Sequence, residues 1–348
     1  MLPQWLIKKT GDPNRTVNIS FDFSNKAVHS FSWSSFTAPS CAKCNSDFAD
    51  LENSVIPIVD KIERREYPNA NEFYVLLDWL DKVRIGLWLT HLNLNRNFTN
   101  ISPMFHISQR VGTKDRMAAI YLVDDLPDGL NAHGAETPLF QVAPSCFALR
   151  INQTLIYNVS ADFLISGRCG FPSPIGMKLV GNEGAATELN YRKLSCKKRH
   201  RTPLLPYPLY MPTIQIYQPI VAKTFDGKYI GENFLVDEFM LNHCIENSDG
   251  KGKLLHLKNN VVTVLNTPDA PIEWSPLPSS AISDYYTLAS QVYEQQITLH
   301  NRIPIRLNDK ELQSQLDREY SEYVKISKTL FKAYKKKGAT LKKIAAKA

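Results

Sequence analysis

The sequence has little cysteine, and it lacks the second half of a metal site. Of its six cysteines, only Cys41 and Cys44 stand three positions apart, and no second Cys-x-x-Cys or Cys-x-x-His occurs in the 348 residues. A structural zinc site needs four ligands, so this pair supplies half of one. The redox alternative requires a βαβ context that the sequence does not predict. The remaining four cysteines stand alone: Cys146, Cys169, Cys196 and Cys244.

Long apolar runs are also absent. No apolar stretch reaches the roughly 18 residues of a transmembrane helix, and the N-terminus lacks the charged and apolar regions of a signal peptide. A few unpaired cysteines are typical of a reducing compartment. We therefore expect a cytoplasmic protein without a membrane partner. Residues 112–116, Gly-Thr-Lys-Asp-Arg, lack the spacing of a nucleotide-binding P-loop, which excludes that motif.

Acidic residues are missing from one region, residues 323–348, which carry nine lysines. The whole chain has a net charge of +7, so the other 322 residues sum to −2. Such a segment can contact backbone phosphates, and Lys335, Lys336 and Lys337 are its candidate nucleic-acid contacts. One alternative is a solvated tail. In another, the segment ends a helix over 309–337 and buries Leu330, Phe331 and Tyr334.

A second basic cluster lies at residues 192–201, with six positive charges in ten residues. Lys197, Lys198 and Arg199 are its candidate nucleic-acid contacts, and an ordinary exposed loop is the alternative. Prolines are frequent just before and after this cluster. We therefore predict that residues 171–215 form a proline-rich, basic connector.

Hydrophobic periodicity predicts both strands and helices. Alternating or short apolar runs predict strands over 17–23, 31–36, 118–123, 146–151 and 154–159. Spacings of three and four predict helices over 48–62, 71–91, 284–299 and 309–337. Asn152-Gln153 is typical of a hairpin turn between two of the strands.

Two of the helices carry local signals. Pro57 predicts a break or a late first turn in the helix over 48–62. Asn71 is the candidate N-cap of the helix over 71–91. That helix has an apolar stripe typical of a core element. The opposite face carries Asp78, Asp81, Lys82 and Arg84.

These elements predict an α+β protein. We expect an incomplete ββα zinc finger, then a mixed domain of helices and antiparallel strands, and finally a helical basic C-terminus. The predicted regions are a finger over 1–65, a helix and β-rich region over 66–170, the connector over 171–215, an α+β region over 216–322, and the lysine-rich tail over 323–348.

The first 60 residues resemble a divergent branch of the HNH (ββα-metal) endonuclease family. That family carries a Cys-x-x-Cys, then Glu-His before a hydrophobic pair and Pro-x-Trp-Leu, and later Cys-x-x-Cys-Asn. Leu2, Pro3, Trp5 and Leu6 match the end of the first segment. The second segment and its helix are matched by Cys41, Cys44, Asn45, Leu51 and Glu52.

The resemblance implies zinc on Cys41 and Cys44, a catalytic role for Asn45, and Mg²⁺ or Mn²⁺ for phosphodiester hydrolysis. The family's Glu-His pair would fall immediately before Met1. We therefore expect either a start assigned too far downstream or a degenerate member, and in both cases a catalytically incomplete chain. His29 is a candidate substitute for a ligand or base, and Asp47 and Glu52 are candidate cation ligands; the alternative for all three is an ordinary structural or solvated side chain.

Two functions follow from these expectations. The first is an HNH-type endonuclease acting on nucleic acid, with DNA as the expected substrate. The second is a non-catalytic module that binds nucleic acid or a protein and uses the zinc knuckle only structurally. By analogy with the family, a protein partner would come from a defence or mobile-element system.

Overall fold

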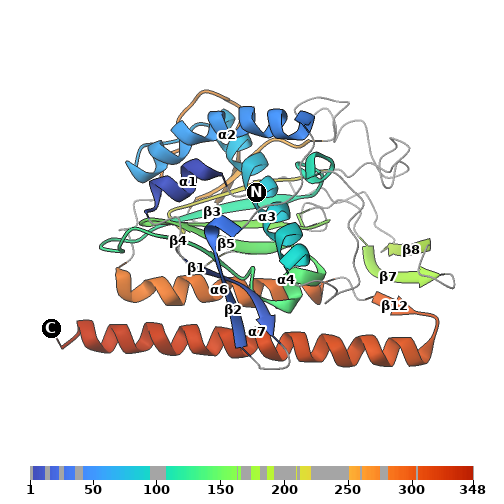
Figure 1. Cartoon of the computed structure of the whole chain (residues 1–348). Coiled ribbons are helices and arrows are strands. Elements are labelled where there is room, and N and C mark those ends of the chain that lie inside the picture. The colour runs from blue at the N-terminus through green and yellow to red at the C-terminus, as the bar shows by residue number, and fades with distance from the viewer. Residues whose placement is uncertain are drawn as a thin grey trace.

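The fold is described from a computed structural model. It describes residues 3–11, 16–22, 27–35, 42–94, 107–162, 164–165, 174–180, 186–191, 209, 212–220, 251–258, 261–274, 281–302 and 305–347. Within these residues the chain is α+β, with helices on both faces of an antiparallel sheet (Figure 1).

The central sheet has seven strands in the order β11-β10-β9-β3-β6-β5-β4, and every neighbouring pair is antiparallel. The strands are β3 (Arg116–Leu122), β4 (Leu130–His133), β5 (Cys146–Ile151), β6 (Thr154–Ser160), β9 (Ile214–Gln218), β10 (Leu255–Lys258) and β11 (Val261–Val264). The strands predicted over 118–123, 146–151 and 154–159 are confirmed. So is the turn between β5 and β6, where Asn152 has a positive φ of 49°.

Successive side chains of these strands point to opposite faces, and in β3, β5, β6 and β9 both faces are buried. In β3, Ala118 and Ile120 belong to one hydrophobic core, whereas Ala119 and Tyr121 belong to the other. All seven residues of β3 are buried. This explains why the strands are almost continuously apolar in sequence, although the sheet is antiparallel.

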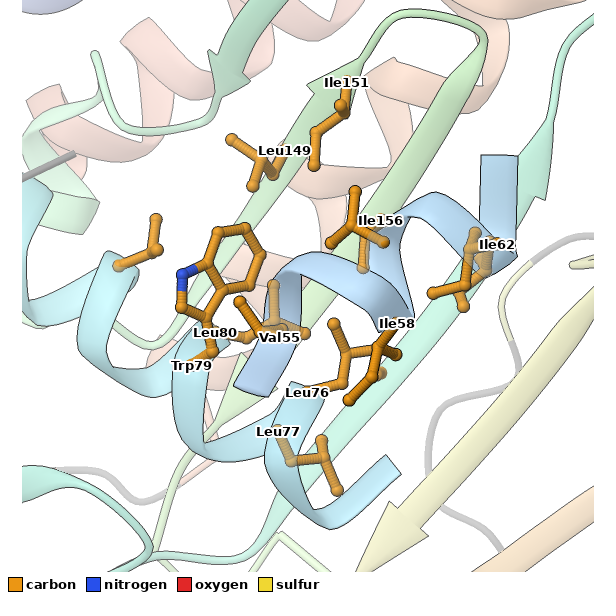
Figure 2. Packing of buried hydrophobic residues seen from close by; sticks show 14 of the residues in the cluster. Val55, Ile58, Ile62, Leu76, Leu77, Trp79, Leu80, Leu149, Ile151 and Ile156 are labelled. Atoms are coloured by element: carbon orange, nitrogen blue, oxygen red, sulfur yellow. The ribbon is translucent and has the colours of Figure 1, made fainter. Parts of the chain in front are cut away.

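Two long helices, α2 (Ala42–Glu63) and α3 (Ala70–Leu94), cover the first face. Side chains of both helices point toward those of β5 and β6 (Figure 2). The buried centre of this layer is apolar, with Val55, Ile58 and Ile62 from α2 meeting Leu76, Leu77 and Leu80 from α3. Burying each such side chain contributes about 1.5–3 kcal/mol, so this layer holds the N-terminal half of the chain to the sheet.

Helix α2 is longer than predicted and does not break at Pro57. Pro57 and Asn53, whose carbonyl loses its helical partner there, both lie on the exposed face, where water can bond to that carbonyl. On the opposite face, Val55, Ile58 and Val59 are buried and hold both halves of the helix against the core. The prediction of a break was therefore wrong.

Helix α3 confirms the prediction over 71–91, but its cap is Asn69 rather than Asn71. The Asn69 side chain accepts a hydrogen bond from the backbone N–H of Glu72 at 2.9 Å, and Glu72 Oε2 accepts from the Asn69 N–H at 2.7 Å. This reciprocal pair is a capping box. Asn71 instead donates from its side chain to Asp269 at 2.9 Å.

The polar face predicted for α3 is largely buried, which the sequence pattern did not indicate. Asp81 and Arg84 are 0% and 3% exposed and form an ion pair of 2.9 Å. Arg116 of β3 adds contacts of 3.2 Å to Asp81 and 2.5 Å to Asp78. Further bonds run from Arg84 to Asn158 and from Arg116 to Gln218, so that α3 is tied to the sheet by charge.

Helices α6 (Ile282–His300) and α7 (Lys310–Ala345) lie on the second face, with α7 outermost (Figure 1). They confirm the helices predicted over 284–299 and 309–337. The short helix α4 (Pro138–Val142) contacts both of them and also α3, and Thr137 caps its N-terminus. The second face therefore has two helical layers, the inner of which packs on the strands.

The N-terminal segment contains α1 (Gln4–Lys9), β1 (Thr16–Asp22), β2 (Ala27–Ser32) and η1 (Trp33–Ser35), followed by α2. Strands β1 and β2 pair as an antiparallel hairpin, so the chain order is ββα. Strand β1 confirms the strand predicted over 17–23. The strand predicted over 31–36 is wrong in position, because β2 ends at Ser32 and the buried Trp33 begins a 3₁₀ helix that packs on the first core. Ser24-Asn25-Lys26, between these strands, is typical of a turn in sequence, and these three residues lie outside the described ones.

A separate three-stranded sheet has the order β12-β7-β8. Strands β7 (Pro174–Val180) and β8 (Ala186–Tyr191) fall in the predicted connector, and β12 (Ile305–Leu307) joins α6 to α7. The central sheet draws strands from both sides of that connector. The boundaries of the five predicted regions stay a prediction.

The short helix η2 (Ile107–Arg110) precedes β3 and lies beside α3.

Candidate nucleic-acid interface

Helix α7 carries the basic residues of the C-terminal segment. Asp309 caps it, accepting hydrogen bonds from the backbone N–H groups of Glu311 at 2.7 Å and Leu312 at 3.1 Å. The helix then continues for 36 residues. The lysine-rich region is thus the end of a long helix. This agrees with the alternative in which the segment ends the helix predicted over 309–337.

The inner face of α7 packs on α6 and the second core. Leu330, Phe331 and Tyr334 lie against that core. Gly338 is buried at a close approach of the two helices, where a Cβ would lie 2.6 Å from the Thr287 hydroxyl of α6. Leu330, Phe331 and Tyr334 are therefore already packed within the protein.

Neutral polar groups beneath the contact between α6 and α7 fix the position of α7. His133 of β4 lies between two tyrosines, with Nδ1 3.0 Å from the Tyr334 hydroxyl and Nε2 2.5 Å from the Tyr285 hydroxyl. Burial lowers the pKa of His133 to about 3, and the nearby Arg150 contributes to this shift. The ring is therefore neutral, so one nitrogen accepts and the other donates.

Glu136 adds a second polar contact beneath α7. Its Oε1 accepts a hydrogen bond of 2.5 Å from Tyr293 of α6, whose ring packs on Tyr334. Burial raises the pKa of Glu136 to about 7, although the bond from Tyr293 acts in the opposite direction. Among the described residues its other oxygen has no hydrogen-bond partner.

The outer face of α7 is a row of lysines. All nine lysines of residues 323–348 are exposed. Six of them recur at helical spacings of three, four or seven, which places five on one side of α7 and the sixth, Lys347, in the turn directly after it: Lys325, Lys328, Lys332, Lys336, Lys343 and Lys347. We call these six residues the lysine face. At 1.5 Å per residue the face is about 33 Å long.

Few acids compensate this charge. Within the described chain, ion pairs engage only two of the nine lysines, Lys325 with Glu322 and Lys342 with Asp284, both at 2.5 Å. Two others lie over aromatic rings: Lys335 is 4.3 Å from the Phe331 centroid, and Lys337 is 4.2 Å from that of Tyr286. These ring contacts position the ammonium groups without neutralising them.

The predicted contacts Lys335, Lys336 and Lys337 are thus all exposed on α7, and Lys336 belongs to the lysine face. Their role in binding stays a prediction. The other predicted contacts, Lys197, Lys198 and Arg199, lie outside the described residues.

The predicted metal and catalytic residues lie at the start of α2. Asn45 is exposed in its first turn, and Cys44 precedes it in the same turn. Cys41 and the side chains of Cys44 and His29 lie outside the described residues. Zinc binding by the cysteine pair therefore stays a prediction.

The carboxylates proposed as cation ligands are engaged within the protein. Asp47 pairs with Lys43 at 2.8 Å, and Glu52 pairs with the buried Lys82. Within the described ranges, His, Cys, Asp and Glu side chains form no group of three or more that could hold a metal ion. The donor set seen in these residues does not fit a complete metal centre.

Other sequence predictions have clear positions. Cys146 is a buried residue of β5, as predicted, and burial raises the pKa of its thiol. In the rejected phosphate-loop motif, Asp115 accepts backbone hydrogen bonds from Ile165 at 2.7 Å and Ile220 at 2.6 Å, so it fastens two chain segments. Lys114 lines a cavity that the sequence analysis did not predict. The one sequence feature that could have indicated this cavity is the frequency of basic residues between positions 110 and 116.

Across the described part of the chain, no helix combines the length and apolar content needed to cross a membrane. Comparison of the chain with family models, with curated proteins and with solved structures found no match.

Proposed function

We propose that this protein binds nucleic acid through the lysine face of α7. The observation that carries the proposal is the arrangement of the helix: one side is packed against α6, and the other presents six exposed lysines along about 33 Å. Such a row matches roughly one turn of a B-form duplex. Binding would release counterions from the phosphates.

The packing of α7 favours a nucleic acid over an acidic membrane. A helix that lies on a membrane inserts an apolar face below its basic face. In α7 the apolar side chains Leu330, Phe331 and Tyr334 are already packed within the protein. The lysine face can therefore meet a phosphate backbone without any rearrangement of the fold.

Lysines carry point charges and read little sequence information. Binding should therefore be similar for unrelated sequences and should weaken steeply with salt.

The test replaces four lysines of this face by glutamine: Lys328, Lys332, Lys336 and Lys343. We expect affinity for a labelled 30-base-pair duplex to fall on the order of 100-fold near 0.1 M salt. The slope of log affinity against log salt should become shallower by about 0.9 for each phosphate that the variant no longer neutralises. Fluorescence anisotropy at several salt concentrations measures both quantities.

A matched control removes the same charge from exposed sites outside α7: Lys8, Lys43, Arg64 and Arg306, all replaced by glutamine. Its affinity should change far less than that of the first variant. Equal losses in the two variants, at equal melting temperatures, would reduce the effect to net charge and contradict a specific lysine face.

We propose as a second candidate that the N-terminal segment belongs to an HNH-type endonuclease. The chain order β1-β2-α2, with Cys44 and Asn45 in the first turn of α2, favours it. Plasmid cleavage in the presence of Mg²⁺ or Mn²⁺ that disappears in Asn45→Ala would support this candidate. Cleavage that persists in Asn45→Ala would contradict the catalytic role predicted for Asn45. An intact plasmid is the result expected of a catalytically incomplete chain, and it would leave binding as the activity of these residues.

A further inference from the structure

A cavity of about 340 Å³ opens beside α3, and none of its lining residues belongs to the lysine face. Its walls come from α3, η2, the residues just before β3, the end of α4 with the segment that leads to β5, the end of β6 with the segment after it, and the C-terminal end of α6. This volume lies within the range of small-ligand sites.

The polar part of the wall is cationic. Lys114 forms an ion pair of 2.5 Å with Asp162, and Arg302 donates to the Asp162 backbone carbonyl at 2.6 Å, so the three residues lie together. Arg110 adds a further positive charge, and Asp162 is the one carboxylate that lines the cavity. The positive charge of these residues exceeds the negative charge by two, which favours an anionic ligand.

Arg84 also lines the cavity but is committed elsewhere. Its guanidinium donates to Asp81 at 2.9 Å, to Asn158 at 2.9 Å and to the backbone carbonyl of Pro144. It therefore forms part of the wall. Arg110, Lys114 and Arg302 are the other cations that line the cavity.

The rest of the wall combines a hydroxyl with apolar groups. The Ser145 hydroxyl is buried and has no hydrogen-bond partner among the described residues. Trp88 donates its indole N–H to the Gln141 carbonyl at 2.6 Å, so it presents an apolar surface to the cavity. Ile85 and Val142 extend this surface, and Val142 is 43% exposed.

We infer that this cavity binds a nucleotide phosphate, carried either by a free nucleotide or by the end of a nucleic-acid strand. Guanidinium and ammonium groups, with a hydroxyl donor, are the groups that recognise phosphate oxygens. The apolar wall beside them suits a nucleotide base. The inference does not depend on the lysine face, since it uses none of the same residues.

The experiment measures binding in the variant that lacks four lysines of α7, so that non-specific binding by that helix is reduced. The probes are adenosine 5′-monophosphate, inorganic phosphate, and a 12-nucleotide single strand with and without a 5′-phosphate, each titrated calorimetrically. The substitutions Arg110→Gln, Lys114→Gln and Arg302→Gln are combined in one variant. We expect it to bind the nucleotide at least tenfold more weakly.

A second variant protects the test against misfolding, because Lys114 and Arg302 also contact Asp162. Val142→Glu places a carboxylate at the apolar wall and leaves every cation in place. Val261→Glu is its matched control, since Val261 is 57% exposed on the edge strand β11. We expect Val142→Glu to weaken nucleotide binding about tenfold and Val261→Glu to leave it unchanged. All variants should retain the melting temperature of the parent.

Saturable binding of the free nucleotide that disappears in the cavity variants would support a nucleotide site. Binding only of the 5′-phosphorylated strand that disappears in the same variants would support a strand-end site. The inference is overturned if no probe binds saturably, or if binding in Val142→Glu and in the cation variant equals that of the parent.

Discussion

The two faces of the central sheet bury polar groups in opposite ways. On the α3 face, Asp81 pairs with Arg84 and Arg116, so charge meets charge. On the α6 and α7 face, His133 and Glu136 bond to tyrosine hydroxyls. Burial shifts the pKa of both toward the neutral form, to about 3 for His133 and to about 7 for Glu136.

The difference shows two solutions to the cost of removing a charge from water. A buried ion needs a partner of opposite charge, and removing that partner is costly. A buried titratable group without such a partner changes its protonation state instead. The second solution links the docking of α7 to proton binding by Glu136 and His133.

The largest expected effect comes from breaking the charged network. Asp81→Asn keeps the side-chain shape but leaves Arg84 without its carboxylate and Arg116 with Asp78 alone. We expect the free energy of unfolding to fall by roughly 3–5 kcal/mol. Urea denaturation measures this. Glu66→Gln, which breaks an exposed ion pair with Arg64, should leave the stability unchanged, and an equal loss there would contradict the distinction.

A smaller effect is expected from the buried polar groups His133 and Glu136 and their tyrosine partners. The ordinary pKa of 4.5 for Glu136 rises to about 7 in the folded protein, so the folded state holds more protons between these values. The stability contributed by this protonated group is complete below pH 4.5 and is lost as the pH rises to about 7. Glu136→Gln should remove this loss. The free energy of unfolding of the variant should therefore rise relative to that of the parent by up to about 3 kcal/mol between pH 4.5 and pH 8.

His133 acts in the opposite direction. Its pKa falls from 6.5 to about 3, so its stabilising contribution is present above pH 6.5 and is lost as the pH falls. The two groups partly cancel between pH 4.5 and 6.5. Denaturation of parent and Glu136→Gln at each pH isolates Glu136. A stability difference that does not vary with pH would show that Glu136 is charged when folded.

The smallest effect concerns the contact between α6 and α7. Gly338→Ala would place a methyl group 2.6 Å from the Thr287 hydroxyl. Overpacking costs about 1–3 kcal/mol, whereas alanine favours the helix by about 1 kcal/mol, so we expect a net loss of about 1 kcal/mol. Adding Thr287→Ala should restore much of the stability in thermal melts. A single Gly338→Ala variant more stable than the parent would show that the helices are not in close contact.

Much of the fold could be predicted from the sequence where a local pattern decides the structure. Strands β5 and β6 are short apolar runs joined by Asn152-Gln153, and α3 has a continuous apolar stripe. These signals depend only on nearby residues. The pairing of β3 with β9 could not be predicted, because it joins segments far apart and no local signal marks it.

The burial of charged residues could also not be predicted from the sequence pattern. Asp81 and Arg84 occupy positions that are polar by periodicity, and partners distant in sequence, among them Arg116 and Asn158, make their burial acceptable. The same limit applies to the candidate sites. The lysines of α7 were evident from composition, whereas their restriction to one face depends on how α7 packs on α6. The cavity beside α3 draws residues from six separate segments, so no motif marks it.

The central position of β3 has a consequence for the kinetics of folding. Ile120 pairs with Ile156 on one side and with Ile214 on the other, 36 and 94 positions further along the chain. By contrast, Ile151 and Thr154 pair directly across the turn between β5 and β6. Closing the loop to Ile214 costs roughly 3 kcal/mol more entropy than closing that hairpin. We therefore expect β5, β6 and β3 to assemble first, and the transient edge of β3 to be where an incompletely folded chain associates with another.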